Sequence, residues 1–147
     1  MSVVAYKNGV MCSDSRAYGG KYMPPAGVKR KAHELPDGSI LGIVSADLGE
    51  PEKFLAWYKA GAAVDDWKGD PPKIRAIRVD GFCQLWLYDE SLHPSGPIDT
   101  NCYAIGSGGE FALGAMLAGL DPFEAVRIAC LLDGNCGEPV HTLRIPT

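Results

Sequence analysis

Two short apolar runs joined by Asn8-Gly9 restrict the fold more than any other part of the sequence. The stretch reads SVVAYK-NG-VMCSDS, and Asn and Gly both accept the positive φ that a type I′ turn requires. We therefore predict a β-hairpin here. Counting outward from the turn places Val3 opposite Asp14 and Ser2 one residue beyond that pair.

The middle of the chain repeats this pattern of strand and turn. In KAHELPDGSILGIVS the turn is Pro36-Asp37-Gly38, and in KIRAIRVDGFCQLWLYD an Asp-Gly pair separates two apolar runs. NCYAIG and, near the C-terminus, EPVHTLRI have the spacing of two further strands. Strands therefore dominate the middle of the sequence.

Three segments have helical patterns instead. GEPEKFLAWYKAG carries Phe54, Leu55 and Tyr58 on one helical stripe. GEFALGAMLAGL is rich in small and apolar residues, and DPFEAVRIACLLD begins with Asp121 at the cap position and Pro122 in the first turn. Hairpins, a helix, more strands, two helices and a last strand indicate an α+β fold in which helices cover two antiparallel sheets.

Size and charge limit the possible partners. With 147 residues and 46% apolar content, the chain fits one domain, residues 1–147, with one well-buried core. A formal net charge of −4 and the short basic run at 29–31 argue against nucleic acid. No apolar stretch approaches the ~20 residues of a bilayer span, and no export signal is expected. Five cysteines without a CxxC favour a reducing, cytoplasmic compartment.

No cofactor or metal is expected from the motifs. Walker loop, HExxH and GxSxG patterns are absent, and GSGG at 106–109 lacks the spacing of a dinucleotide fingerprint. Cys130, Cys136 and His141 match no standard zinc spacing, which favours structural cysteines. Nothing in the spacing supports a contact between Cys136 and His141 as a nucleophile and its base.

Three stretches carry a family resemblance: AYKNGVMCSDSRA, YAIGSGGEFALGAMLAG and ACLLDGNCGEPVHTLRI. Together and in this order they resemble the proteasome β-subunit family and its bacterial relative HslV, which are N-terminal nucleophile hydrolases. The most specific piece is AIGSGG followed by a small-residue helix. The resemblance implies a four-layer αββα sandwich of two antiparallel sheets between helices. We expect one helix layer to be reduced, because only AAVDDWKGDPP separates Gly61 from the next strand.

The resemblance also implies a reaction in which the N-terminal residue supplies the nucleophilic hydroxyl and its own α-amine acts as base. Such an amine titrates near about pH 8 and is partly neutral in a cell. Asp14 and Lys31 fit the family positions beside the nucleophile, where an ammonium holds the amine neutral. Counting back from HEL selects Lys31, whereas counting forward from Val28 selects Arg30.

The register of the first hairpin favours Ser2 as the nucleophile. In the HslV-type hairpin the nucleophile stands one residue beyond the partner of its Asp, and Ser2 has that place relative to Asp14. Ungapped matching of VVAYK selects Met1 instead. Ser is small enough for methionine aminopeptidase to accept as the second residue, so loss of Met1 would give Ser2 a free α-amine.

The other site positions follow from the same resemblance. Ser107, Asp133 and Cys136 fall where the family supports the α-amine, with Cys136 a weaker donor than the usual hydroxyl. Ala46 stands where the family has glycine, whose backbone N–H stabilises the oxyanion. An alanine can donate the same N–H if its φ is negative.

The prediction is thus a threonine-peptidase-like hydrolase that cleaves peptides or unfolded proteins with an N-terminal serine. The alternative is a catalytically inactive proteasome-like subunit with a structural or assembly role, as short phage-borne relatives suggest. The family resemblance implies a homo-oligomeric ring. No unfoldase partner can be identified from the sequence.

Overall fold

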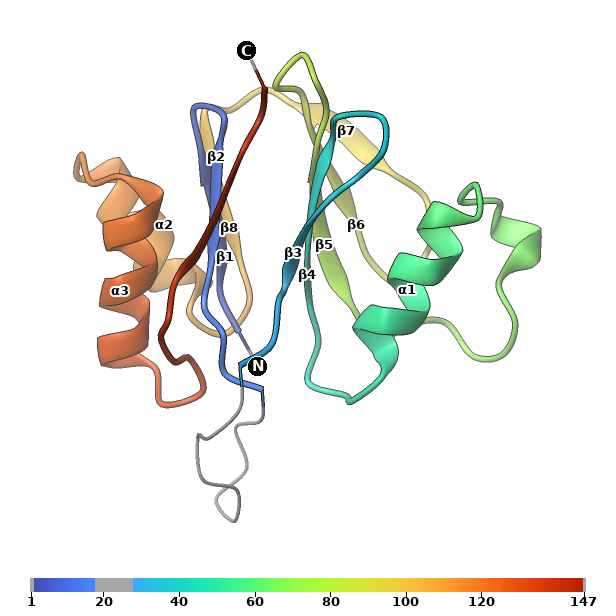
Figure 1. The fold of residues 1–147 in the computed structure, drawn as a ribbon, viewed down its shortest axis with the longest axis horizontal. Coiled ribbons are helices and arrows are strands. Elements are labelled where there is room, and N and C mark those ends of the chain that lie inside the picture. The colour runs from blue at the N-terminus through green and yellow to red at the C-terminus, as the bar shows by residue number, and fades with distance from the viewer. Residues whose placement is uncertain (1, 18–27, 147) are drawn as a thin grey trace.

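The computed structural model describes residues 2–17 and 28–146, which form four layers (Figure 1). Two helices cover a first β-sheet, a second sheet faces the first, and another helix covers the far side of the second sheet. The strands are β1 (Val4–Lys7), β2 (Val10–Ser13), β3 (Ala32–Glu34), β4 (Ile40–Val44), β5 (Arg75–Val79), β6 (Leu85–Tyr88), β7 (Ser95–Ile98), β8 (Cys102–Ile105) and β9 (His141–Arg144). The helices are α1 (Glu50–Lys59), α2 (Gly109–Leu117) and α3 (Pro122–Leu132), with a 3₁₀ turn η1 (Val64–Asp66). The predicted αββα sandwich is confirmed.

The first sheet has the strand order β8-β1-β2-β9, and all its pairs are antiparallel. The predicted hairpin and its register are confirmed, because Val4 pairs with Ser13 and Asn8 and Gly9 both have positive φ in the turn. The Asp14 N–H donates to the Val3 carbonyl at 3.2 Å, which continues the ladder one residue beyond β1.

The second sheet has the order β3-β4-β5-β6-β7 and is also antiparallel. The sequence patterns predicted all of its strands except β7, which was missed. Its sequence, SGPI, shows no alternation of apolar and polar residues, and its first three residues are exposed. An edge strand tolerates Pro97, since one side of its backbone needs no partner in the sheet.

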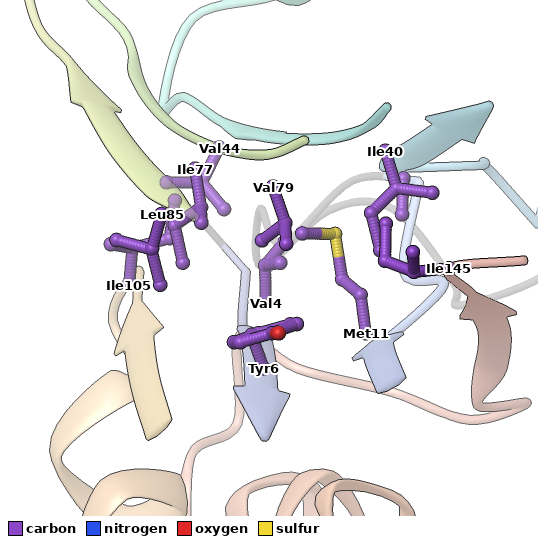
Figure 2. Packing of buried hydrophobic residues seen from close by; sticks show 11 residues of the cluster. Val4, Tyr6, Met11, Ile40, Val44, Ile77, Val79, Leu85, Ile105 and Ile145 are labelled. Carbon is purple, nitrogen blue, oxygen red and sulfur yellow. The ribbon is translucent and has the colours of Figure 1, made fainter. Parts of the chain in front are cut away.

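The central core lies between the two sheets. Val4 and Met11 reach into it from the first sheet, and Ile40 and Val79 from the second (Figure 2). Gly42 lets the sheets approach closely, because a Cβ at that position would lie 2.4 Å from Cγ1 of Val4. The sheets therefore pack through a largely apolar layer that fixes their relative position.

The two helix layers differ in size, as the short segment after Gly61 predicted. α2 and α3 pack against each other and cover the first sheet, with Asp121 accepting the Glu124 N–H at 2.8 Å as the predicted cap of α3. Among residues 2–17 and 28–146, the second sheet is covered only by α1 and the short η1, and Phe54 and Trp57 of α1 are buried there. Within the described residues, no helix has the length and apolar content to cross a membrane.

Candidate active site

Ser2 lies two residues before the start of β1, at the end of the sandwich where the N-terminus is drawn in Figure 1. Its side chain is buried, with 4% of the residue exposed. The Ser2 carbonyl accepts the Gly108 N–H at 3.2 Å. Gly106 has φ +98°, and a Cβ there would lie 2.0 Å from the Ser2 carbonyl oxygen. The segment 106–109 after β8, which we call the glycine loop, thus holds the backbone of Ser2 by direct contact.

A buried ion pair lies beside this segment. The Lys31 Nζ is 2.9 Å from Oδ1 and 3.0 Å from Oδ2 of Asp14, and both side chains are almost completely buried. Oδ1 of Asp14 also accepts the Val3 N–H at 3.0 Å, and Oδ2 accepts the Gly137 N–H at 3.1 Å and the Arg16 N–H at 3.3 Å. Asp14 therefore links the ammonium to the backbone just after Ser2.

Lys31 rather than Arg30 is brought to Asp14. The Lys31 carbonyl accepts the Ile43 N–H at 2.8 Å, which extends the pairing of β3 with β4 by one residue and points the Lys31 side chain inward. Arg30, the alternative that the sequence left open, is exposed. Burial lowers the pKa of the Lys31 ammonium, whereas the Asp14 carboxylate opposes this shift.

Asp133 and Cys136, which follow α3, are gathered with Ser107 of the glycine loop. Oδ1 of Asp133 accepts the Asn135 N–H at 3.0 Å, and Oδ2 accepts the Cys136 S–H at 3.4 Å. Burial by itself would raise the pKa of Asp133, but hydrogen bonds from Ser107, Asn135 and Cys136 outweigh it and lower the pKa. Burial raises the pKa of the Cys136 thiol far above its ordinary value, so this side chain acts as a donor.

The backbone at Ala46 is available to a ligand. Ala46 follows β4, is exposed, and is not among the described residues with positive φ. Its N–H donates to no other residue in the described part of the chain. The neighbouring loop is fixed by Ser45, whose hydroxyl donates to the Lys73 carbonyl at 2.5 Å.

Two cavities meet at Ser2, and Ser45 and Ala46 also line both of them. One, which we call the basic cavity, has a volume of about 220 Å³ and is lined in addition by Arg16, Ala17, Lys29, Arg30, Lys31, Ile43, Asp47, Leu48, Pro51 and Asn135. The other, the proline cavity, has about 500 Å³ and is lined in addition by Val44, Pro71, Pro72, Lys73, Ile74, Arg75, Glu90, Gly106 and Ser107. A chain passing Ser2 can enter one cavity on each side.

The remaining alternatives from the sequence receive no support from the geometry. Cys136 contacts Asp133, while the Nδ1 of His141 lies 3.3 Å from the Ser15 hydroxyl, so these two side chains have different partners. Within residues 2–17 and 28–146, no three His, Cys, Asp or Glu side chains are placed to hold a metal ion.

Gly137 and Arg16 are site residues that the sequence analysis missed. Gly137 donates its N–H to Asp14, and a Cβ at Gly137 would lie 2.8 Å from the Arg16 Nε. The glycine that directly follows Cys136 was the available signal, since a glycine beside a predicted site residue often allows close approach of another group.

A comparison of the whole chain with solved structures shows which known folds it resembles. HslV from Trypanosoma brucei superposes with a TM-score of 0.64 at 19% identity, over 97% of this chain and 98% of that one. The chain has the HslV fold. Thiobacillus denitrificans BPH has the same fold, with TM-scores of 0.62 in complex with epoxomicin and 0.58 in a second structure, both at 18% identity. These superpositions cover 99% of this chain, and 99% and 98% of the BPH chains.

The similarity to HslV is found in the structure and not in the sequence. No protein-family model matches the sequence, and no curated protein sequence is similar enough to count as a relative. The fold that this chain shares with HslV and BPH is therefore established by the arrangement of strands and helices. The superpositions span the chain from end to end, which confirms the resemblance inferred from the three sequence stretches.

Proposed function

We propose that residues 1–147 act as one peptidase domain that cleaves peptide bonds with Ser2 as its nucleophile, once Met1 has been removed. The observation that carries this proposal is the position of Ser2, one residue beyond the pairing of Val3 with Asp14, whose buried carboxylate holds the Lys31 ammonium. The meeting of two cavities at the same residue supports it, because a peptide must lie on both sides of the nucleophile.

In the proposed first step, the Ser2 hydroxyl oxygen attacks the carbonyl carbon of the scissile peptide bond. The hydroxyl proton passes to the Ser2 α-amine, directly or through one water. The nearby Lys31 ammonium disfavours a proton on that amine and so keeps it ready as a base. The oxyanion that forms on the carbonyl accepts the N–H of Ala46, which has no partner among the described residues.

In the second step the tetrahedral intermediate collapses. The C–N bond breaks, the leaving amine takes the proton back from the Ser2 ammonium, and the acyl half stays on Ser2 as an ester. A water then attacks the ester carbonyl and gives one proton to the same amine. The bond between the Ser2 oxygen and the acyl carbon breaks, the Ser2 oxygen takes that proton back from the ammonium, and a carboxylic acid leaves. Ser107, Asp133 and Cys136 are proposed to orient the amine from the side of the glycine loop.

Intact mass measurement and inhibitor labelling test the proposal together. The purified chain should be lighter than the full sequence by one methionine. Epoxomicin is the probe of choice, because it is bound by BPH, which shares the fold. Labelling and peptide hydrolysis should both disappear in Ser2→Ala, whose small second residue still allows removal of Met1. Ser2→Thr keeps a hydroxyl and should retain activity.

Ser91→Ala provides the matched control, because Ser91 lies in an exposed turn outside both cavities. It should label and hydrolyse like the unmodified chain. A full-length mass with Met1 in place, or labelling that survives Ser2→Ala, would favour the inactive structural subunit instead.

Light scattering at micromolar concentration tests the proposed homo-oligomeric ring, and the mass of a single chain would count against it.

A further inference from the structure

The basic cavity concentrates positive side chains in a protein whose overall charge is negative. Backbone pairing brings them together. Arg16 and Val28 form an isolated antiparallel bridge, and the Lys29 N–H donates to the Ser15 carbonyl at 2.9 Å. The segment after β2 and the segment before β3 therefore run side by side, and the cationic residues of both line one cavity.

The two lysines of this cavity are already neutralised. Lys29 Nζ lies 2.7 Å from a carboxylate oxygen of Glu52, and Lys31 is held by Asp14 as described above. Asp47 is the carboxylate that lines the cavity, and it lies 3.7 Å from the Lys73 Nζ. The remaining positive charge is that of the two arginines.

Arg16 and Arg30 form no ion pair with a carboxylate of residues 2–17 or 28–146. Between these two ranges the sequence reads YGGKYMPPAG, which contains no Asp or Glu. The Arg16 Nε is buried and has no hydrogen-bond partner among the described residues. A buried guanidinium N–H without an acceptor is costly, so this group is suited to an acceptor supplied by a ligand.

Gly137 allows the Arg16 guanidinium to take this position. A Cβ at Gly137 would lie 2.8 Å from Nε and 3.1 Å from a terminal nitrogen of Arg16. The same Gly137 donates its N–H to Asp14. The guanidinium is thus packed against the backbone that supports the Asp14 and Lys31 pair, one contact away from the proposed catalytic centre.

We propose that the basic cavity is a specificity site that binds the carboxylate of an Asp or Glu side chain next to the scissile bond of a peptide. The proposal rests on the peptidase function above and names its substrate class. An arginine side chain presents a planar set of donors that matches a carboxylate, and such charged hydrogen bonds are stronger than neutral ones. Ile43, Leu48 and Pro51 line the same cavity and can contact the methylene groups of the substrate side chain.

A cleavage profile of a mixed peptide library tests the proposal. Mass spectrometry of the products should show Asp and Glu enriched at one fixed position within two residues of the cleaved bond. For a matched pair of peptides that differ by Glu or Gln at that position, kcat/KM should favour Glu by about tenfold at low salt. The preference should shrink as ionic strength rises, because part of the site is open to solvent.

Arg30→Gln should reduce kcat/KM for the Glu peptide by a larger factor than kcat/KM for the Gln peptide, so that the ratio between the two peptides falls. Arg30 is exposed, so this variant leaves the buried pair intact. Arg127→Gln is the matched control: it removes the same charge from α3, outside the cavity, and should keep the preference for Glu. Cleavage without enrichment of acidic residues would overturn the specificity site but keep the peptidase function.

A binding measurement separates the two proposals. Ser2→Ala keeps the cavity and removes the nucleophile, so a benzophenone-bearing peptide with Glu should crosslink to it in higher yield than the same peptide with Gln. If no peptide is hydrolysed but this difference is found, the function fails and the carboxylate site stands. If the unmodified chain hydrolyses nothing and both peptides crosslink equally, both proposals are overturned.

Discussion

The Lys31 Nζ lies 2.9 Å from Oδ1 of Asp14 in a pair that joins the two sheets of the sandwich. Asp14 directly follows β2 of the first sheet, and Lys31 directly precedes β3 of the second. The pair is almost completely buried, and the backbone N–H groups around Asp14 share its charge. This ionic contact therefore connects the end of β2 to the start of β3 beside Ser2.

Removing one member of this pair should be more damaging than removing both. Asp14→Asn or Lys31→Met leaves an uncompensated buried charge, and we expect each to lower the free energy of unfolding by about 3–5 kcal/mol. The double variant should lose less than the sum of the single changes, because no charge is left unpaired. Urea denaturation measures all three values.

An exposed ion pair serves as the comparison for these three variants of the buried pair. Lys73 and Asp47 lie 3.7 Å apart with exposed side chains. Lys73→Met should barely change the midpoint of unfolding, because exposed ion pairs contribute little. Additive effects in the double Asp14 and Lys31 variant would show that the pair is not coupled as the geometry indicates.

Substitution of Gly106 should displace Ser2. An alanine there would place its Cβ 2.0 Å from the Ser2 carbonyl oxygen at a φ of +98°, so either the glycine loop or the start of β1 must shift. We expect Gly106→Ala to lose stability and all peptide hydrolysis. Thermal unfolding and an activity assay give the two readouts.

Gly114→Ala is the control for that substitution. Gly114 lies inside α2, and a Cβ at this position meets nothing within 4 Å. Alanine is the better helix former, and the change should stabilise the chain by roughly 0.5–1 kcal/mol. Equal stability and equal peptide hydrolysis of Gly106→Ala and Gly114→Ala would rule out a special constraint at Gly106.

The sequence predicted those parts of the fold that depend on local chemistry. The Asn8-Gly9 turn set the register of the first hairpin, and the cap at Asp121 marked the start of α3. β7 was missed, because an edge strand with Gly96 and Pro97 has no apolar alternation and is held by pairing with β6. Tertiary pairing, not local preference, makes that segment a strand.

The sequence named several of the residues that the structure brings together near Ser2, but it missed Arg16 and Gly137 and did not show how the charges are arranged. Counting residues could not decide between Lys31 and Arg30, since the choice depends on how the segment before β3 pairs with β4. The three-residue basic run at 29–31 reads as solvated in sequence, yet Lys31 is buried. The approach of Arg16 to that run depends on the bridge between Arg16 and Val28, which no local pattern encodes.

The cysteines should differ sharply in reactivity. Cys83 is exposed, whereas Cys12, Cys102 and Cys136 are buried, and burial raises the pKa of Cys130 to about 11. Iodoacetamide near pH 8 should add one group to the folded chain, at Cys83, and five after denaturation, one for each cysteine in the sequence. Peptide mapping locates the adducts.

Alkylation of the folded chain should leave peptide hydrolysis unchanged, because Cys136 acts as a hydrogen-bond donor to Asp133 and remains a thiol. Cys83→Ser is the control and should remove the single adduct. Rapid modification of Cys136 together with loss of activity would indicate a thiolate nucleophile and would contradict the assignment of Ser2.

Asp133 should make the stability of the chain depend on pH in the acid range. Hydrogen bonds from Ser107, Asn135 and Cys136 outweigh burial and lower the pKa of this carboxyl in the folded state. A carboxyl with a lower pKa when folded stabilises the protein fully above its unfolded pKa, about 3.9 for Asp. That contribution is lost as the pH falls through the folded value, because both states are then protonated.

Asp133→Asn should therefore be less stable than the parent chain at pH 6, and the difference should narrow as the pH is lowered past about 4. Urea unfolding of both chains over this pH series measures it. Asp70→Asn, which changes an exposed carboxyl, is the control and should give curves parallel to those of the parent. A stability difference for Asp133→Asn that stays constant or grows toward acid pH would mean that the charged carboxylate is not the form held by Ser107 and Cys136.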